Sequence, residues 1–270
     1  MRHATFFALL FTAVSAIANP SGHLTVLVPI NPGTLAGAGA QWTTTLWATN
    51  TGDLDAFLGC THASNDDPCP VLKAHTTTAL ATPYFDLTHP GFFEGPFSGV
   101  IPNPASPDQV SFSLRATDSN TAPQSAGTEI PLPRPSDFHN AKIALAQIPV
   151  TSHSRSRLRL YGITNGTATV RAIGITSNQE LFRTVVALDG VDTLPTPINP
   201  LAPIPAIRFP SYAEIALPDS YGGSEEAVRI EITPGGDLKL WAFASVTDNV
   251  SQQFTIVSPS IFEYISISAL

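Results

Sequence analysis

The sequence predicts an all-β fold, and three observations favour it. Proline (25 residues) and glycine (18 residues) are abundant, whereas charged residues make up only 13% of the 270, a composition that suits short strands joined by turns. Several segments alternate apolar and polar side chains with a period of two, as half-buried antiparallel strands do, and few show a helical period. Three sequence elements also recur in the same order in the two halves of the chain, which indicates two tandem copies of one β-sandwich.

Residues 1–18, MRHATFFALLFTAVSAIA, have the pattern of a secretory signal peptide. Arg2 and His3 precede an apolar run, and Ala16 and Ala18 occupy the two positions that a signal peptidase inspects, which predicts cleavage before Asn19. The apolar run is too short to span a bilayer, and no stop-transfer pattern follows it. We therefore expect a secreted or periplasmic/extracellular protein with no membrane insertion.

Residues 19–133 are predicted to form the first sandwich. Apolar-alternating runs between turn residues give seven strands in this part of the chain. They lie near 24–30, 43–50, 54–60, 72–80, 97–102, 110–117 and 127–132. The glycine-rich GTLAGAGA at 33–40 lacks the lysine of a phosphate-binding loop, and we expect it to be a flexible surface loop.

Residues 134–270 are predicted to form the second sandwich, after a proline-rich linker at 131–139. Its strands lie near 142–150, 155–164, 167–176, 180–188, 212–217, 227–233, 237–247 and 252–258. The alternation is clearest in the strand near 227, where Val228, Ile230 and Ile232 occupy every second position. Segment 194–210 carries six prolines and is expected to be a largely extended loop, because proline cannot donate to a central ladder.

The sequence similarity between the two halves is clearest in two strand–turn–strand stretches, LWATNTGDLDAFLG at 46–59 and LYGITNGTATVRAIG at 160–174. Asn50 and Asn165 stand at the turns, where the chain reversal needs a residue that tolerates positive φ or bonds its own backbone. This folding requirement explains the repeated asparagine without a separate chemical role.

Seven or eight short strands per half are typical of immunoglobulin-like sandwiches. The stretch LWATNTGDLDAFLG resembles the strand–turn–strand of secreted bacterial immunoglobulin-like domains that carry V-x-N-x-G between two strands. The opening LVPINPGTLAGAGAQWTTTLW is similar to that of secreted bacterial proteins of unknown function, with Thr44 or Thr45 where an acidic residue is common. The resemblance implies a fold, an exported location and an adhesive, spacer or carbohydrate-adjacent role. It supplies no catalytic residue.

Cys60 and Cys69 are the two cysteines of the chain. A close pair in an exported protein is expected to form a disulfide, and closing this short loop contributes about 2–3 kcal/mol on the chain-entropy account. The alternative is a metal site that uses both thiolates with His62 or His75. Oxidising surroundings and the lack of a second cysteine pair favour the disulfide.

Within that loop, Asn65, Asp66 and Asp67 form a weak candidate calcium site, because Ca²⁺ prefers carboxylate and amide oxygens. The spacing lacks the regular ligand alternation of a known calcium loop, so a plain solvated turn is favoured. No other metal site and no cofactor are expected.

Aromatic residues gather at 84–97, on what we expect to be a long connection between strands. They form either a binding surface or a plug over the open end of the core. The members of this cluster are Tyr84, Phe85, Phe92, Phe93 and Phe97. The three tryptophans, in contrast, lie in or beside strands and are expected in the core or on a sheet face.

Charge excludes some partners. Residues 19–133 contain two basic and nine acidic residues, and residues 134–270 contain ten basic and twelve acidic ones, so nucleic acid and anionic membranes are poor partners. The arginine stripe at 155, 157 and 159, with Arg171, is expected to be a solvated strand face balanced by acidic residues opposite, although an anionic partner is an alternative.

No nucleophile-elbow or zinc-protease motif is present in the sequence. The function that the sequence favours is an exported, non-catalytic binding or surface-display protein whose partner is a protein or carbohydrate at the cell surface. The alternative is a secreted or envelope hydrolase with an unrecognised site. A third interpretation is assembly, in which the terminal segment IFEYISISAL pairs with a neighbour's sheet.

Overall fold

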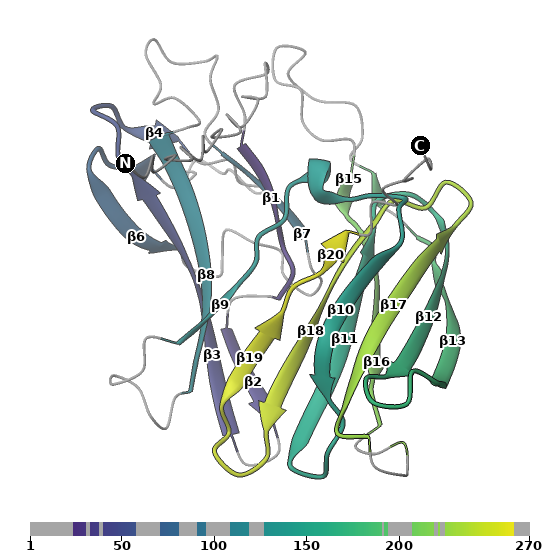
Figure 1. Cartoon of the computed structure of the whole chain (residues 1–270). Coiled ribbons are helices and arrows are strands. Elements are labelled where there is room, and N and C mark those ends of the chain that lie inside the picture. Colours follow the sequence, from purple (N-terminus) through teal and green to yellow (C-terminus); the bar gives the residue numbers. More distant parts are fainter. Residues whose placement is uncertain are drawn as a thin grey trace, which may run out of the picture.

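A computed structural model shows an antiparallel all-β protein (Figure 1). The structure describes residues 24–30, 33–37, 40–57, 71–80, 91–95, 109–118, 127–190, 192–193, 207–218, 221 and 225–261. These residues form twenty strands and one short 3₁₀ turn, and no α-helix occurs among them. Accordingly, this part of the chain contains no helix that is long and apolar enough to cross a membrane. The prediction of an all-β fold is confirmed.

Most of the strand residues described in the first half belong to one five-stranded sheet, which we call the N-terminal sheet. Its strands are β2 (Gly33–Gly37), β3 (Ala40–Asn50), β6 (Thr76–Leu80), β8 (Val110–Asp118) and β9 (Thr128–Ile130). The long strand β3 pairs with β8 along one edge and with β2 and then β6 along the other. Burial alternates along β3 from Thr44 to Asn50, so its even-numbered side chains point inward and its odd-numbered ones point outward.

The second half forms two sheets that face each other. The central sheet has the order β16–β11–β18–β19, and the outer sheet has the order β13–β12–β17–β10–β20. The central strands are β11 (Ser154–Gly162), β16 (Ser211–Ala216), β18 (Leu240–Asp248) and β19 (Phe254–Val257). The outer strands are β10 (Ile143–Pro149), β12 (Gly166–Gly174), β13 (Glu180–Leu188), β17 (Ala227–Gly235) and β20 (Ser260–Ile261).

Three short two-stranded pairs complete the described structure. They are β1 (Leu24–Val28) with β7 (Gly91–Gly95), β4 (Ala56–Phe57) with β5 (Val71–Leu72), and β14 (Asp192–Thr193) with β15 (Ile207–Phe209). The first pair joins segments more than sixty residues apart, from Leu24 opposite Gly95 to Val28 opposite Gly91.

The central sheet separates two hydrophobic cores because both of its faces carry apolar side chains. Leu158, Leu160 and Ala242 point toward the outer sheet and belong to the core between those two sheets. Tyr161, Trp241 and Phe243, at alternate positions of the same strands, join the core of the N-terminal sheet, as do Leu46 and Leu114. In Figure 1 the central strands β18 and β19 accordingly lie between the N-terminal strands and the outer strands β17, β12 and β13.

The segment 131–139, which the sequence predicts as a linker, lies close to both halves. The Leu27 amide donates to the Pro133 carbonyl at 2.7 Å, and Phe138 is buried in the core that contains Tyr161. A 3₁₀ turn, η3 (Pro135–Asp137), precedes Phe138. The backbone of His139 then exchanges two hydrogen bonds with Leu240. The division of the chain near residue 133 stays a prediction, and extensive contacts cross it.

Several predicted elements differ from the structure. GTLAGAGA was expected to be a flexible loop, but residues 33–37 form β2, because β3 offers a paired edge that local sequence does not reveal. The predicted strand near 72–80 is divided into β5 and β6 by a turn in which His75 has a φ of 54°. Part of the predicted loop 194–210 is strand, since 207–209 pairs with 192–193. The predicted strand near 97–102 and the signal peptide lie outside the described residues.

Candidate functional site

The structure describes two of the residues predicted to form an aromatic binding surface. Phe92 and Phe93 lie in β7, where their backbones pair with Leu27 and Val26 of β1. The expectation that they lie on a long loop is therefore wrong, because a partner strand from the start of the chain gives this glycine-flanked segment its structure. Tyr84, Phe85 and Phe97 lie outside the described residues, so the surface itself stays a prediction. The same holds for Cys60, Cys69, Asn65, Asp66 and Asp67.

The N-terminal sheet carries an exposed tryptophan on its outer face. Trp47 stands near the middle of β3, and 39% of its surface is open to solvent, whereas its neighbours Leu46 and Ala48 are completely buried. In the ladder, Trp47 lies opposite Ser113 of β8 and Ala79 of β6. Both flanking residues are small, so neither of them extends over the indole ring. The prediction that the tryptophans lie in the core or on a sheet face is confirmed, with Trp241 in the core.

Hydroxyl groups surround Trp47 at regular positions. Thr45 and Thr49 lie two residues away on the same strand, about 7 Å in each direction. Thr49 lies opposite Thr77 of β6 and Ser111 of β8, so a row of three hydroxyl side chains crosses the sheet next to the indole. The Thr49 and Thr77 hydroxyls are 3.0 Å apart. We call this surface, which consists of Thr45, Trp47, Thr49, Thr77, Ser111 and Ser113, the tryptophan face.

The charges at outward positions of this sheet are paired with each other. Arg115 of β8 lies between Thr45 and Glu129 in the ladder, and its Nη2 is 3.6 Å from a Glu129 carboxylate oxygen. Among the outward positions of β3, β6, β8 and β9, these are the two charged residues. The tryptophan face is therefore neutral in sum, although the whole chain carries a formal charge of −8.

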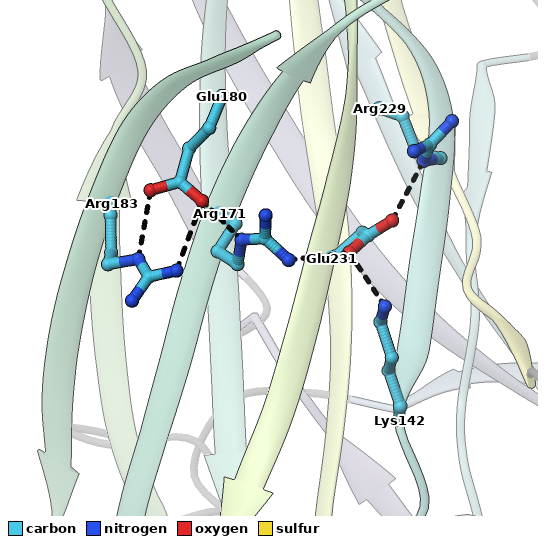
Figure 2. Close-up of polar contacts among 6 residues, drawn as sticks. All are labelled: Lys142, Arg171, Glu180, Arg183, Arg229 and Glu231. Atoms are coloured by element: carbon cyan, nitrogen blue, oxygen red, sulfur yellow. Dashed lines mark hydrogen bonds and ion pairs between the residues drawn. The ribbon is translucent and has the colours of Figure 1, made fainter. Parts of the chain in front are cut away.

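The outer sheet carries a different, charged surface (Figure 2). Glu231 of β17 is held by three cations: Lys142 Nζ at 2.7 Å, Arg229 Nε at 3.0 Å and Arg171 Nη1 at 3.4 Å. Arg171 also contacts Glu180 of β13, as Figure 2 shows. Glu180 is further paired with Arg183, so four cations face two carboxylates. We call these six residues the arginine face, and their formal sum is +2.

The pKa values of both carboxyls in this cluster are lowered. Burial alone would raise the pKa of Glu231, whose side chain is only 8% exposed, but hydrogen bonds and attraction from Lys142 and Arg229 outweigh that effect. Hydrogen bonds from Arg183 and Arg171 lower the pKa of Glu180. Both groups are thus held as carboxylates. A carboxyl kept ionised and fully paired is suited to holding the sheet face together, and it is a poor proton donor near neutral pH.

Two arginines of the predicted stripe, Arg157 and Arg159 of β11, are balanced by an acidic neighbour, whereas Arg155 contacts Gln252 and Arg171 lies on the outer sheet. Glu214 of β16 accepts from Arg157 and from Arg159 Nε at 2.9 Å, and the Tyr212 hydroxyl donates to it at 2.9 Å. Arg159 also lies over the ring of Phe243, 5.6 Å from its centroid. The attraction of the arginines and the tyrosine hydrogen bond lower the pKa of Glu214 despite its partial burial. Arg159 thus links the surface ion pair with Glu214 to Phe243, which belongs to the core shared with the N-terminal sheet.

The asparagine predicted to make the first turn does so from a buried position. Asn50 Oδ1 accepts from the Gly52 amide at 2.9 Å, and its Nδ2 donates to the carbonyls of Leu54 and Leu72 at 2.8 and 3.2 Å. The prediction that Asn50 bonds its local backbone is confirmed. Asn50 also ties the turn to β5, a contact that the sequence does not reveal.

The described residues bring together no group of three histidine, cysteine, aspartate or glutamate side chains that suits a metal ion. His75, which the sequence associates with the cysteine loop, has its Nε2 3.0 Å from an Asp53 carboxylate oxygen on the surface. The described surface carries a neutral face with an exposed tryptophan on the N-terminal sheet and a cationic face on the outer sheet. Sequence reasoning missed the tryptophan face, although the alternation in TTTLWATN, with Thr45, Trp47 and Thr49 two residues apart, was the available signal.

No protein-family model matches this chain, and no curated protein or solved structure is significantly similar to it.

Proposed function

We propose that the chain is an exported, non-catalytic module that binds a ligand at the cell surface, built from two immunoglobulin-like sandwiches that follow a signal peptide. The two facing antiparallel sheets of residues 143–261 support the sandwich part of this proposal. The signal-like residues 1–18 support export.

The observation that carries the proposal is the position of Trp47. A tryptophan at an outward position of a sheet leaves apolar surface in contact with water, and 39% of the Trp47 side chain stays exposed in this way. Tryptophan is also the residue type most enriched at energetically important positions of binding interfaces. The residues directly opposite it, Ala79 and Ser113, are small, and 39% of Trp47 stays open to solvent.

The proposal is tested by binding and turnover measurements on the same material. The exported chain is immobilised and exposed to purified envelope proteins and polysaccharides from the source organism, with Trp47→Ala as the variant. Saturable binding that weakens in Trp47→Ala, without any chemical change in the ligand, supports a binding module. Hydrolysis of a bound ligand by the wild-type chain would show instead that the protein is an enzyme.

A further inference from the structure

Resting on the proposed function, we infer that the ligand of the tryptophan face is a neutral polysaccharide, a chain of uncharged sugar rings. Two properties of the face carry this inference: the accessible indole and the hydroxyl groups around it. A third, the absence of net charge, separates it from the arginine face.

The indole of Trp47 is suited to stack on a sugar ring. The face of an aromatic ring is electron-rich, and the C–H bonds on one side of a pyranose carry partial positive charge, so the two surfaces attract each other. Burial of both apolar surfaces adds to this attraction. The residues directly opposite Trp47, Ala79 and Ser113, are small, so on those two sides no larger side chain stands between a flat ring and the indole.

The hydroxyls of Thr45, Thr49 and Ser113 surround the stacking position on three sides. A hydroxyl both donates and accepts hydrogen bonds, which matches the mixed donor and acceptor character of sugar hydroxyls. The row Thr77, Thr49 and Ser111 extends this chemistry across three strands, so it offers contacts to sugar units beyond the one on the indole. An extended, repeating ligand therefore fits the surface better than a single small molecule.

Charge distinguishes between two kinds of polysaccharide. Arg115 and Glu129 are paired with each other, so the tryptophan face gives an anionic polymer no unpaired cation to bind. An anionic polymer would instead be attracted by the excess positive charge of the arginine face. The two surfaces therefore predict different salt dependences. Binding of a neutral chain to the tryptophan face should not change with salt, whereas binding of an anionic polymer to the arginine face should weaken as salt screens the attraction.

The test is affinity electrophoresis of the exported chain in native gels that contain hydroxyethylcellulose, galactomannan or dextran as neutral polymers, and alginate as an anionic one. We expect at least one neutral polymer to retard the wild-type chain to the same extent at low and high salt. Trp47→Ala should weaken that binding about tenfold or more, as loss of an aromatic stacking partner does elsewhere. Trp47→Phe, which keeps a ring, should retain part of it.

Two matched controls accompany these variants. Tyr212→Ala removes an aromatic side chain that is 40% exposed, nearly the same fraction as Trp47, but lies on the central sheet. Arg183→Gln removes a cation of the arginine face that is 58% exposed. Both should bind neutral polymer as the wild type does. Unchanged circular dichroism and a melting temperature near that of the wild type show that Trp47→Ala is folded.

Three outcomes would overturn the inference: no retardation by any neutral polymer, equal retardation of wild type and Trp47→Ala, or salt-sensitive retardation by alginate alone that is lost in Arg183→Gln. The last outcome, or Trp47-dependent binding to a protein, removes the neutral polysaccharide but leaves the proposed binding function in place. Hydrolysis of the polymer in the gel would contradict the proposed function itself.

Discussion

The hydroxyl of Tyr161 links the two halves of the chain, and its removal provides a sharp test of the fold. Tyr161 belongs to β11 of the central sheet, is completely buried, and donates a hydrogen bond to the carbonyl of Pro29 at 2.8 Å. Burial raises its pKa well above the usual value of 10, so the hydroxyl stays a donor throughout the physiological range. The ring packs against Trp241 and Phe243, with centroids 5.7 and 6.2 Å away.

Tyr161→Phe keeps these ring contacts and removes only the hydroxyl. The buried Pro29 carbonyl then loses this donor, which is expected to cost about 1–2 kcal/mol of unfolding free energy. For a chain of this size that corresponds to a fall in melting temperature of about 2–8 °C. Tyr212→Phe is the matched control, because its hydroxyl contacts Glu214 at the surface, and a change of less than about 0.5 kcal/mol is expected.

The assay is urea unfolding followed by tryptophan fluorescence and by circular dichroism. Because residues of both halves share one core, we expect one transition that moves to lower urea as a whole, with the slope unchanged. A midpoint equal to that of the wild type would refute the role assigned to the hydroxyl. Two transitions, of which only one moves, would refute the shared core as the unit of stability.

Three further predictions concern buried or paired polar groups. Glu231→Gln should lower the unfolding free energy, measured by urea unfolding, by about 1–2 kcal/mol. This loss is smaller than for a fully buried ion pair, because the three cations around Glu231 reach solvent. An increase in stability would contradict the role given to the ion pairs. Asn50→Ala should lower the unfolding free energy by about 2–4 kcal/mol in the same assay, because three backbone groups lose their side-chain partner. Asn50→Asp should not restore this stability, since a carboxylate cannot donate to the two carbonyls. Full stability of either variant would show that water replaces the amide. Acid should destabilise the protein, because the folded-state pKa values of Glu180, Glu214 and Glu231 lie below the ordinary 4.5. The stability that these carboxylates contribute is present above pH 4.5 and is lost as the pH falls through the lowered values. A melting temperature that stays constant or rises on acidification would contradict this sign.

Local sequence was sufficient to predict the strands that alternate cleanly. The segments near 155–164 and 167–176 appear in the structure as β11 and β12, because polar and apolar residues alternate along most of each segment. Asn50 was predictable for the same reason, since its amide serves its own turn.

Features that depend on distant partners were not predictable in this way. Nothing in GFFEG indicates that β1, more than sixty residues earlier, pairs with it, and nothing in GTLAG marks it as the neighbour of β3. Likewise, the alternation in β11 shows that Tyr161 and Leu160 point in opposite directions, but it does not show that apolar partners cover both sides. The candidate site was harder still, because Ala79 and Ser113 flank Trp47 only once three separate strands have paired.

The two-faced central sheet sets an order in which the chain can mature. Trp241 and Phe243 belong to the same core as Val26, so the polypeptide has to be synthesised beyond residue 243 before its first strands can make all of their core contacts. Until then, the apolar sides of β3 and β8 have no cover from the central sheet. If the chain crosses a membrane on export, it can therefore remain unfolded during translocation. It would complete its fold only after its last strands have crossed.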